Sequence, residues 1–334
     1  MLRVGVMGAG SIGCYVGGRI LAANAAEVVL VGRQRLQAEV AAHGLTAVSL
    51  DARFPVAPER VRVATDVEAL SECDIVLVAV KSAQTEDVAR SLQAVLREDA
   101  TVVSLQNGVR NAPTLRAHLG ARPVVAAVVG FNVVSKGEGV FHNGMTGPMQ
   151  LERGGETTAT VFRKAGLETE VHEDLAPHQW TKLLVNLNNA VSALSGAPTV
   201  MLLQTPGYRR IIAAVIEEAL SVLRTAGIKP ASLRGVPIGV MPTVLRLPTF
   251  LVRLVTRAQF KVDPEARSSM WEDLQRGRRT EVDFLNGEVA ELAAKVSAKA
   301  PLNARIVELV RAAEADGGGS PELSPSALAA ALGM

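Results

Sequence analysis

A polar stripe runs along a segment whose other residues predict a buried helix. The segment "KLLVNLNNAVSALSG" begins at Lys182 and carries three asparagines beside that lysine. Each helical residue advances by about 100°, which places Asn186 and Asn189 about 40° and 20° to either side of Lys182. Asn188 would lie about 120° away, off that face. Lys182, Asn186 and Asn189 are therefore expected to border a binding site, while the leucines between them pack a core.

A lysine in that position could serve as a proton donor. Burial lowers the pKa of an ammonium group toward neutrality, where it releases a proton readily. The same cation beside a carbonyl would stabilise negative charge that develops on the oxygen. The alternative is a structural set of amides that satisfy backbone groups between domains.

A second polar segment, "ARSSMWEDLQRGRRTEVDFLNG", contains Ser269 and Glu281. On one straight helix these residues would be about 18 Å apart, too far to contact one small substrate. Gly277 predicts a helix end, and Thr280 predicts a new helix start, so the break permits both side chains to converge. Taken singly, a glutamate such as Glu281 is more often an acid in a first helical turn, and a serine such as Ser269 an amino-terminal cap.

The start of the chain carries a phosphate-binding pattern. In "VGVMGAGSIGCYVGG", Gly8, Gly10 and Gly13 form a G-x-G-x-x-G frame between a predicted strand and a predicted helix. Gly8 permits the tight turn, Gly10 lets the backbone approach a pyrophosphate, and Gly13 lets helix and strand pack closely. A plain tight turn between strand and helix is the alternative.

The choice of cofactor is predicted from the end of the second strand, "EVVLVGRQRL". A cofactor without a 2′-phosphate is usually held there by an acidic side chain. Here Arg33 and Arg35 follow the strand, and the first carboxylate is Glu39. A guanidinium fits a phosphate, so the sequence favours NADP (NADPH). Two solvated surface arginines are the alternative, more so for Arg35 than for Arg33.

Two further strands end in polar residues. "DIVLVAV" leads to Lys81, with Gln84 three residues later, and "TVVSLQ" leads to Asn107. Ligands of open α/β sheets bind beyond the carboxyl ends of the strands, so these side chains are candidate ligand contacts. Gly108 also makes Asn107 compatible with an ordinary turn.

These residues require two kinds of domain to position them. Short β-branched runs alternate with helical stretches in the first half, which predicts an α/β fold with a Rossmann-type NADP-binding domain over residues 1–173. Glycine-rich sequence from Val133 to Leu151 predicts strands and turns that finish this domain. From Pro177 onward helical spacing dominates, which predicts an all-α substrate and catalytic domain over residues 174–316. Residues 317–334 predict a flexible tail with a short helix.

The composition of the chain limits the classes of binding partner that we expect. With 48% hydrophobic residues and a formal net charge of +2, the chain is globular and lacks the charge expected for binding nucleic acid or anionic membranes. The most apolar late stretch, "PIGVMPTVLRLPTFLVRLV", is interrupted by prolines and arginines and predicts no membrane span. Two cysteines and a chain start without a signal-peptide pattern favour the cytoplasm. Five unclustered histidines predict no metal requirement. A small-molecule partner is expected, and a homodimer is left open.

Together the motifs resemble the ketopantoate reductase (2-dehydropantoate 2-reductase) family of the 6-phosphogluconate-dehydrogenase-like superfamily. The resemblance runs from "GAGSIG" through "VAVKSAQ", "SLQNGV" and "KLLVN" to "RSSMWEDLQRGRRTEVDFLNG". It implies that Lys182 is the catalytic lysine and Glu281 the active-site glutamate. The binding roles that it implies are the substrate carboxylate for Ser269, the substrate for Asn186, substrate and nicotinamide for Asn107, and NADP for Arg33, Lys81 and Gln84.

Three features depart from the family pattern. Members often carry an asparagine where this chain has Ala190, and Asn189, one residue earlier, would substitute for it on the same helix face. Many also carry an asparagine where this chain has Ala266. The segment from Val236 to Asp263 is longer than in compact members. Reduction of a 2-oxo acid is thus better supported than reduction of ketopantoate itself.

The resemblance implies NADPH-dependent reduction of ketopantoate to pantoate, a step in the biosynthesis of pantothenate, the coenzyme A precursor. An NADP-dependent reductase of another 2-oxo or 3-hydroxy acid is the main alternative. A nicotinamide-nucleotide sensor without turnover is the alternative from another class. Such a sensor would not need Lys182 and Glu281 together, so their presence counts against it.

Overall fold

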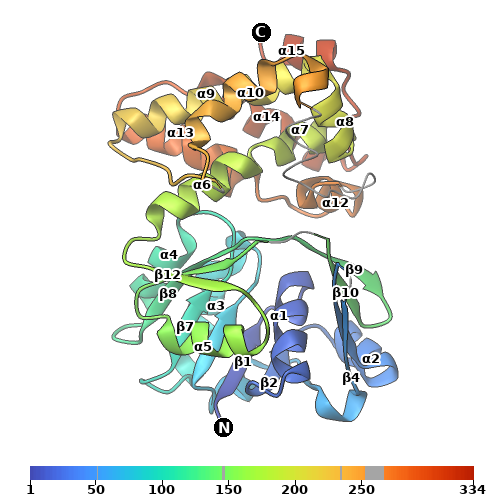
Figure 1. Cartoon of the computed structure of the whole chain (residues 1–334), viewed down its shortest axis with the longest axis vertical. Coiled ribbons are helices and arrows are strands. Elements are labelled where there is room, and N and C mark those ends of the chain that lie inside the picture. The colour runs from blue at the N-terminus through green and yellow to red at the C-terminus, as the bar shows by residue number, and fades with distance from the viewer. Residues whose placement is uncertain (51, 145–146, 234, 253–266) are drawn as a thin grey trace. The chain divides into compact units, whose positions relative to one another are not determined.

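The computed structural model describes the whole chain except residues 51, 145–146, 234 and 253–266. The chain forms two compact units, Met1–Leu175 and Ala176–Met334 (Figure 1). The first unit contains a mostly parallel sheet with helices, and the second is helical. The predicted fold class is therefore confirmed. Among the described residues, no helix combines the length and the apolar character that crossing a membrane requires.

The first unit is built on an eight-stranded sheet in the order β12-β11-β8-β7-β6-β1-β2-β5. The six strands from β8 to β5 run parallel, whereas β11 is antiparallel to β8. Their β-branched runs suit strands that are buried on both faces. The strands are β1 Arg3–Met7, β2 Glu27–Val31, β5 Arg62–Ala64, β6 Ile75–Val78, β7 Thr101–Ser104, β8 Val124–Val129, β11 Met149–Glu152 and β12 Thr169–His172.

Helices cover both faces of this sheet. Residues of α1 and α5 join one apolar cluster with the sheet, and residues of α3 and α4 join a second cluster on the other side. This arrangement is the doubly wound layering that the alternating sequence pattern predicts. The α-helices of the unit are α1 Ser11–Ala22, α2 Gln34–His43, α3 Thr85–Val95, α4 Asn111–His118 and α5 Glu156–Lys164, and the short 3-10 helices are η1 Pro58–Arg60, η2 Val67–Leu70 and η3 Ser82–Gln84.

A second, four-stranded sheet packs against α1. Its order is β4-β3-β10-β9, with strands β3 Leu45–Ser49, β4 Ala52–Val56, β9 Val133–Gly137 and β10 Val140–Asn143. The sequence predicted strands in the glycine-rich region of β9 and β10. It gave no indication of β3 and β4; β3 pairs with β10, about 90 residues later in the chain, and β4 pairs with β3.

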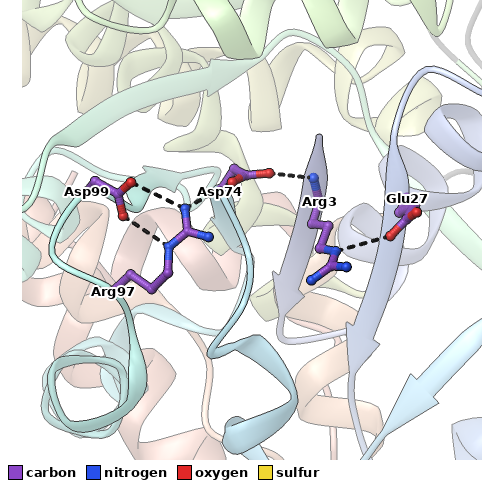
Figure 2. A network of polar contacts seen from close by, with 5 residues as sticks. All are labelled: Arg3, Glu27, Asp74, Arg97 and Asp99. Atoms are coloured by element: carbon purple, nitrogen blue, oxygen red, sulfur yellow. Dashed lines mark hydrogen bonds and ion pairs between the residues drawn. The ribbon is translucent and has the colours of Figure 1, made fainter. Parts of the chain in front are cut away.

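Charged side chains gather where the strands of the main sheet begin (Figure 2). The Arg3 backbone N–H donates to Asp74 at 2.8 Å, and the Arg3 side chain pairs with Glu27 at 3.3 Å. Arg97 pairs with Asp74 and with Asp99, each at 3.0 Å. The Arg3 backbone hydrogen bond, with the Arg97 guanidinium, holds the pKa of Asp74 below its usual value. This network ties strand starts together at the amino edge of the sheet, opposite the edge where Lys81 and Asn107 follow their strands.

The second unit is arranged around its longest helix, α9 Pro206–Thr225, against which most of the other helices pack (Figure 1). Helices α7 and α12 form another close pair. The remaining elements are α6 Ala176–Asn186, α7 Asn188–Ser195, α8 Thr199–Gln204, η4 Ile238–Val240, α10 Met241–Arg246, α12 Ser269–Gln275, η5 Val282–Phe284, α13 Asn286–Lys295, α14 Pro301–Asp316 and α15 Pro325–Ala331.

Residues 317–334 contain a short helix, α15 Pro325–Ala331, as predicted, and the segment also contacts the rest of the second unit. The backbone N–H of Leu323 donates to the Leu194 carbonyl at 2.9 Å, and the Tyr208 hydroxyl donates to the Leu323 carbonyl at 2.9 Å. In α15, Leu328 is fully buried. Two long-range hydrogen bonds and one buried leucine thus attach this segment to the rest of the second unit.

Candidate active site

The three glycines of the phosphate-binding loop differ in what surrounds them. A Cβ atom on Gly8 would lie 2.7 Å from the Val80 backbone nitrogen, and Gly8 has a φ of +94°. A Cβ atom on Gly13 would lie 2.7 Å from the Gly8 carbonyl oxygen. No atom lies within 4 Å of a Cβ atom built on Gly10. Gly8 and Gly13 are thus required for packing, and Gly10 leaves open space, as a pyrophosphate would need.

The loop presents backbone donors to that space. Strand β1 ends at Met7, and the first hydrogen bond of α1 runs from the Cys14 N–H to the Gly10 carbonyl at 2.9 Å. The N–H groups of the three preceding residues therefore have no partner within the helix. They point along the helix axis, where the helix dipole also favours an anion. Because β1 lies between β2 and β6, the loop is at the point where strand order reverses.

The residues that would distinguish NADPH from NADH follow β2. Arg33 is exposed directly before α2, and Arg35 is exposed two residues later. The Glu39 carboxylate accepts a hydrogen bond from the Gly139 N–H at 2.9 Å. The first carboxylate after β2 is thus engaged with another part of the unit. Two exposed arginines, with the first carboxylate after them already engaged, fit a 2′-phosphate better than a bare ribose.

Lys81 and Asn107 follow neighbouring strands. Val78 of β6 pairs with Ser104 of β7, so the two strands end at the same edge of the sheet. Lys81 is half-buried at the start of η3, and Gln84 at its end is exposed. Asn107 is half-buried. The structure therefore brings these predicted contacts to the edge that also carries the glycine loop.

Sequence analysis missed a group of buried polar residues behind this edge. Gln106 and Asn111 form hydrogen bonds with Thr85 and Ser82, whose positions in the chain are more than 20 residues earlier. The closely spaced amides of "QNGVRN" were the available signal. Their partners could not be found by spacing, because they belong to a different loop.

In the second unit, Lys182 and Asn186 lie in the last two turns of α6. Lys182 is half-buried, and burial lowers the pKa of its ammonium group from 10.5 to about 8. Asn186 is 9% exposed. A lysine with this pKa can hold a proton at neutral pH and still give it up readily, which is the property that a general acid needs.

The predicted single helix is in fact two helices. Helix α6 ends at Asn186, and α7 begins at Asn188. The Leu187 N–H is shared between the Leu183 and Leu184 carbonyls at 3.0 and 3.4 Å, which marks the irregular turn. Leu187 keeps right-handed helical angles, with φ −58° and ψ −24°, so the chain continues in nearly the same direction.

The side chain of Asn188 accounts for the irregular turn. Its Nδ2 donates to the Val185 carbonyl, and such a local side-chain bond competes with the regular helical pattern. Asn188 is therefore engaged in the structure of the turn. That Asn188 does not share the face of Lys182 stays a prediction.

We expect Asn189→Ala to impair substrate use and Asn188→Ala to leave it intact. Asn189 is proposed to face the substrate, whereas the Asn188 amide bonds to a carbonyl of its own turn. Asn188→Ala should instead lower stability by about 1 kcal/mol, the usual contribution of one hydrogen bond. Steady-state KM and kcat, measured with thermal unfolding of both variants, separate the two effects. A substrate defect in Asn188→Ala with normal kinetics in Asn189→Ala would contradict the assigned helix face.

Helix α12 is anchored to α7 by Ser268. Its hydroxyl donates to the Asn189 carbonyl at 3.1 Å and accepts from the Trp271 N–H at 3.1 Å. Ser268 is therefore the amino-terminal cap, and the alternative that assigned this role to Ser269 is wrong. Ser269 is exposed at the first position of α12. The anchor brings the start of α12 beside the Asn189 backbone, which agrees with a shared substrate site; Ala266 lies outside the described residues.

The segment that carries Glu281 is separated from α12 by the predicted break. Helix α12 ends at Gln275, and Gly277 has a φ of +59°. The Thr280 hydroxyl accepts from the Val282 N–H at 3.2 Å and so starts η5. Glu281 itself is 9% exposed. Gly277 and Thr280 thus act as helix stop and start, and Glu281 directly precedes η5.

Comparison with known proteins shows which family shares this pair of units. Residues 4–156 match the family model described as ketopantoate reductase PanE/ApbA, and residues 174–314 match the model of its C-terminal domain. The chain belongs to the ketopantoate reductase family. The family predicted from the motifs is therefore confirmed.

Similar proteins span the full length of the chain. A 2-dehydropantoate 2-reductase of Pyrococcus horikoshii is 30% identical over 96% of this chain and 100% of its own, and one of Halobacterium salinarum is 31% identical over 95% and 100%. The crystal structure of a PanE/ApbA family ketopantoate reductase from Ralstonia eutropha is 31% identical, has a TM-score of 0.80 and covers 95% of this chain and 99% of its own.

The same fold occurs in a protein solved with NADH. A D-mandelate dehydrogenase solved with NADH and anilino(oxo)acetate is 18% identical, has a TM-score of 0.76 and covers 95% of this chain and 99% of its own. At that identity the likeness concerns the fold alone. Choice between NADH and NADPH therefore has to be argued from the residues after β2.

Proposed function

We propose that this protein reduces 2-dehydropantoate (ketopantoate) to pantoate with NADPH, a step in the biosynthesis of pantothenate, the coenzyme A precursor. It would then be an oxidoreductase that acts on CH–OH groups. The observation that carries the proposal is Lys182, a half-buried lysine whose pKa is lowered by burial to about 8, in a chain of the ketopantoate reductase family. Full-length relatives named 2-dehydropantoate 2-reductase support the same substrate.

The cofactor would be held by the first unit. The N–H groups at the start of α1 would bind the pyrophosphate, and Arg33 the 2′-phosphate. Lys81, Gln84 and Asn107 would contact the rest of the dinucleotide at the adjoining strand ends. When bound, the reduced nicotinamide supplies the hydride for the reaction.

Residues of the second unit would carry the proton chemistry. As hydride adds to the carbonyl carbon, the C=O π bond breaks and negative charge develops on oxygen. The Lys182 ammonium would stabilise that charge and transfer one proton to the oxygen, and the neutral amine would regain a proton from solvent. Glu281 would orient the substrate hydroxyl or the ammonium. Asn186, Asn189 and Ser269 would bind the substrate, with Ser269 at its carboxylate.

The loss of NADPH absorbance tests this function directly. Purified protein should oxidise NADPH with ketopantoate and should prefer this substrate over other 2-oxo acids by kcat/KM. Higher kcat/KM for a bulkier 2-oxo acid would assign the chain to a paralogous reductase. Cofactor binding without turnover on any member of the panel would favour the sensor.

The remaining assignments are proposals of the same kind. The partner would be a small 2-oxo acid, and neither nucleic acid nor membrane is proposed. We place the protein in the cytoplasm, where free thiols persist, because Cys14 and Cys73 are both free and buried. Among the described residues, no group of three or more His, Cys, Asp and Glu side chains could hold a metal ion. The absence of a metal requirement stays a prediction.

A further inference from the structure

A buried chain of hydrogen bonds joins the loop after β6 to the loop after β7. Gln106 Nε2 donates to the Thr85 hydroxyl at 2.7 Å, and that hydroxyl donates to Asn111 Oδ1 at 2.7 Å. Asn111 Nδ2 donates to the Asn107 carbonyl at 2.6 Å and to the Ser82 hydroxyl at 3.2 Å. All the side chains that take part are less than 9% exposed: Ser82, Thr85, Gln106 and Asn111.

Thr85 occupies the centre of this chain. Its single hydroxyl proton is donated to Asn111, so its oxygen must accept from Gln106. The amide orientations follow from the backbone carbonyls at each end, because the Val80 and Asn107 carbonyls can only accept and so require the nitrogens of Gln106 and Asn111. Asn111 therefore presents its oxygen to Thr85. Without the Thr85 hydroxyl, Gln106 and Asn111 would each lose a hydrogen bond inside a buried environment.

The series of hydrogen bonds ends on each side at a backbone carbonyl beside a predicted cofactor contact. Gln106 Nε2 also donates to the Val80 carbonyl at 3.2 Å, and Val80 directly precedes Lys81. At the other end, the acceptor is the carbonyl of Asn107 itself, to which Ser82 donates at 3.3 Å. The backbone at Lys81 and the backbone at Asn107 are therefore held by one neutral, buried network.

We propose that Thr85 is a positioning residue for the cofactor site: its hydroxyl fixes the separation of Lys81 and Asn107. Thr85 is 2% exposed and lies behind the loops, so it acts through those two residues. The inference rests on the proposed function, because Lys81 and Asn107 are cofactor contacts only in that function. A displacement of about 1 Å at a binding site is enough to lower the reaction rate by a large factor. Loss of the network would therefore affect function by moving Lys81 or Asn107.

The test is Thr85→Val, which keeps the side-chain shape and removes the hydroxyl. We expect it to weaken NADPH binding about tenfold, and to lower kcat/KM by at least the same factor. Thr85→Ser restores the hydroxyl and should bind NADPH within about twofold of the wild-type protein. NADPH affinity is measured by fluorescence titration of folded protein well below the unfolding temperature, so it does not depend on which substrate is reduced.

Thr158→Val is the matched control. Thr158 lies in α5 of the same unit and is 1% exposed, and in the described structure its hydroxyl has no hydrogen-bond partner. The same chemical change there removes no network bond. NADPH affinity and kcat/KM should stay at wild-type values, with stability equal or higher.

The outcomes separate this inference from the proposed function. Wild-type affinity in Thr85→Val, with only a lower unfolding temperature, would reduce Thr85 to a structural residue and overturn the inference. So would a Thr85→Ser variant as weak as Thr85→Val. If Thr85→Val does not fold, Ser82→Ala removes two peripheral bonds of the network, to Asn107 and Asn111, and should weaken NADPH binding about threefold; unchanged affinity there overturns the inference. Failure of the wild-type protein to reduce ketopantoate would refute the function and leave these titrations interpretable.

Discussion

Lys182→Ala should reduce turnover with ketopantoate by a factor of about 10²–10⁴ or more while leaving NADPH affinity nearly unchanged. General acid catalysis accounts for that range by itself, and loss of the charge beside the developing alkoxide adds to it. The cofactor contacts that we propose all belong to the first unit, whereas Lys182 belongs to the second. Steady-state rates, measured beside a direct NADPH titration of the folded variant, separate the two effects.

The pKa of Lys182 gives this prediction a pH dependence. The ammonium form is the proton donor, and with a pKa of about 8 it is lost as pH rises through 8. Activity of the wild-type protein should therefore fall as the pH rises above about 8. The residual activity of Lys182→Ala should not show this decrease. Lys182→Arg should recover little, because a guanidinium keeps the charge and hardly releases a proton near neutrality.

The same pKa predicts how stability responds to pH. An unfolded lysine keeps its proton up to about pH 10.5, whereas folded Lys182 loses it above about 8. Between these values the unfolded state binds more protons, so Lys182 makes stability rise with pH. Lys182→Met, which keeps the length without the charge, should lack this rise while losing turnover. Near-normal turnover in Lys182→Ala or Lys182→Met would demote the lysine to a structural residue and reopen the sensor hypothesis.

Features with local steric causes could be predicted from the sequence. Gly8 and Gly13 are required because a Cβ atom would meet backbone atoms at 2.7 Å, and such demands leave glycine as the only choice. The helix stop at Gly277 follows from the same freedom, here at a φ of +59°. In each case a local steric requirement selects glycine, so the feature can be predicted from the sequence alone.

Features that depend on distant partners could not be predicted. The cap of α12 is Ser268 rather than Ser269, and what anchors it is a carbonyl of α7, 79 residues earlier. The Thr85 hydroxyl donates to Asn111, which lies 26 residues later in the sequence. The helix breaks between Asn186 and Asn188, where the Asn188 amide bonds to the Val185 carbonyl, and helical periodicity does not reveal such a break. Spacing along one element indicates which residues share a face, and it does not indicate what that face meets.

Arg33→Ala should weaken NADPH by about 10- to 100-fold and leave NADH almost unaffected, because only the 2′-phosphate loses a charged partner of about 1.5–3 kcal/mol. Arg33 is exposed directly after β2 and Gly32, where a ribose-binding carboxylate would otherwise be expected.

Arg35→Ala is the matched control for this prediction, since Arg35 is equally exposed two residues later. It should change NADPH affinity by less than about threefold if it is a solvated surface residue. Because the fold also occurs in a dehydrogenase solved with NADH, the fold by itself does not select the phosphate. Equal loss of both cofactors in Arg33→Ala would mean that another residue binds the 2′-phosphate. A larger effect from Arg35 than from Arg33 would move the phosphate contact into the first turn of α2, where the helix amino terminus would share the charge.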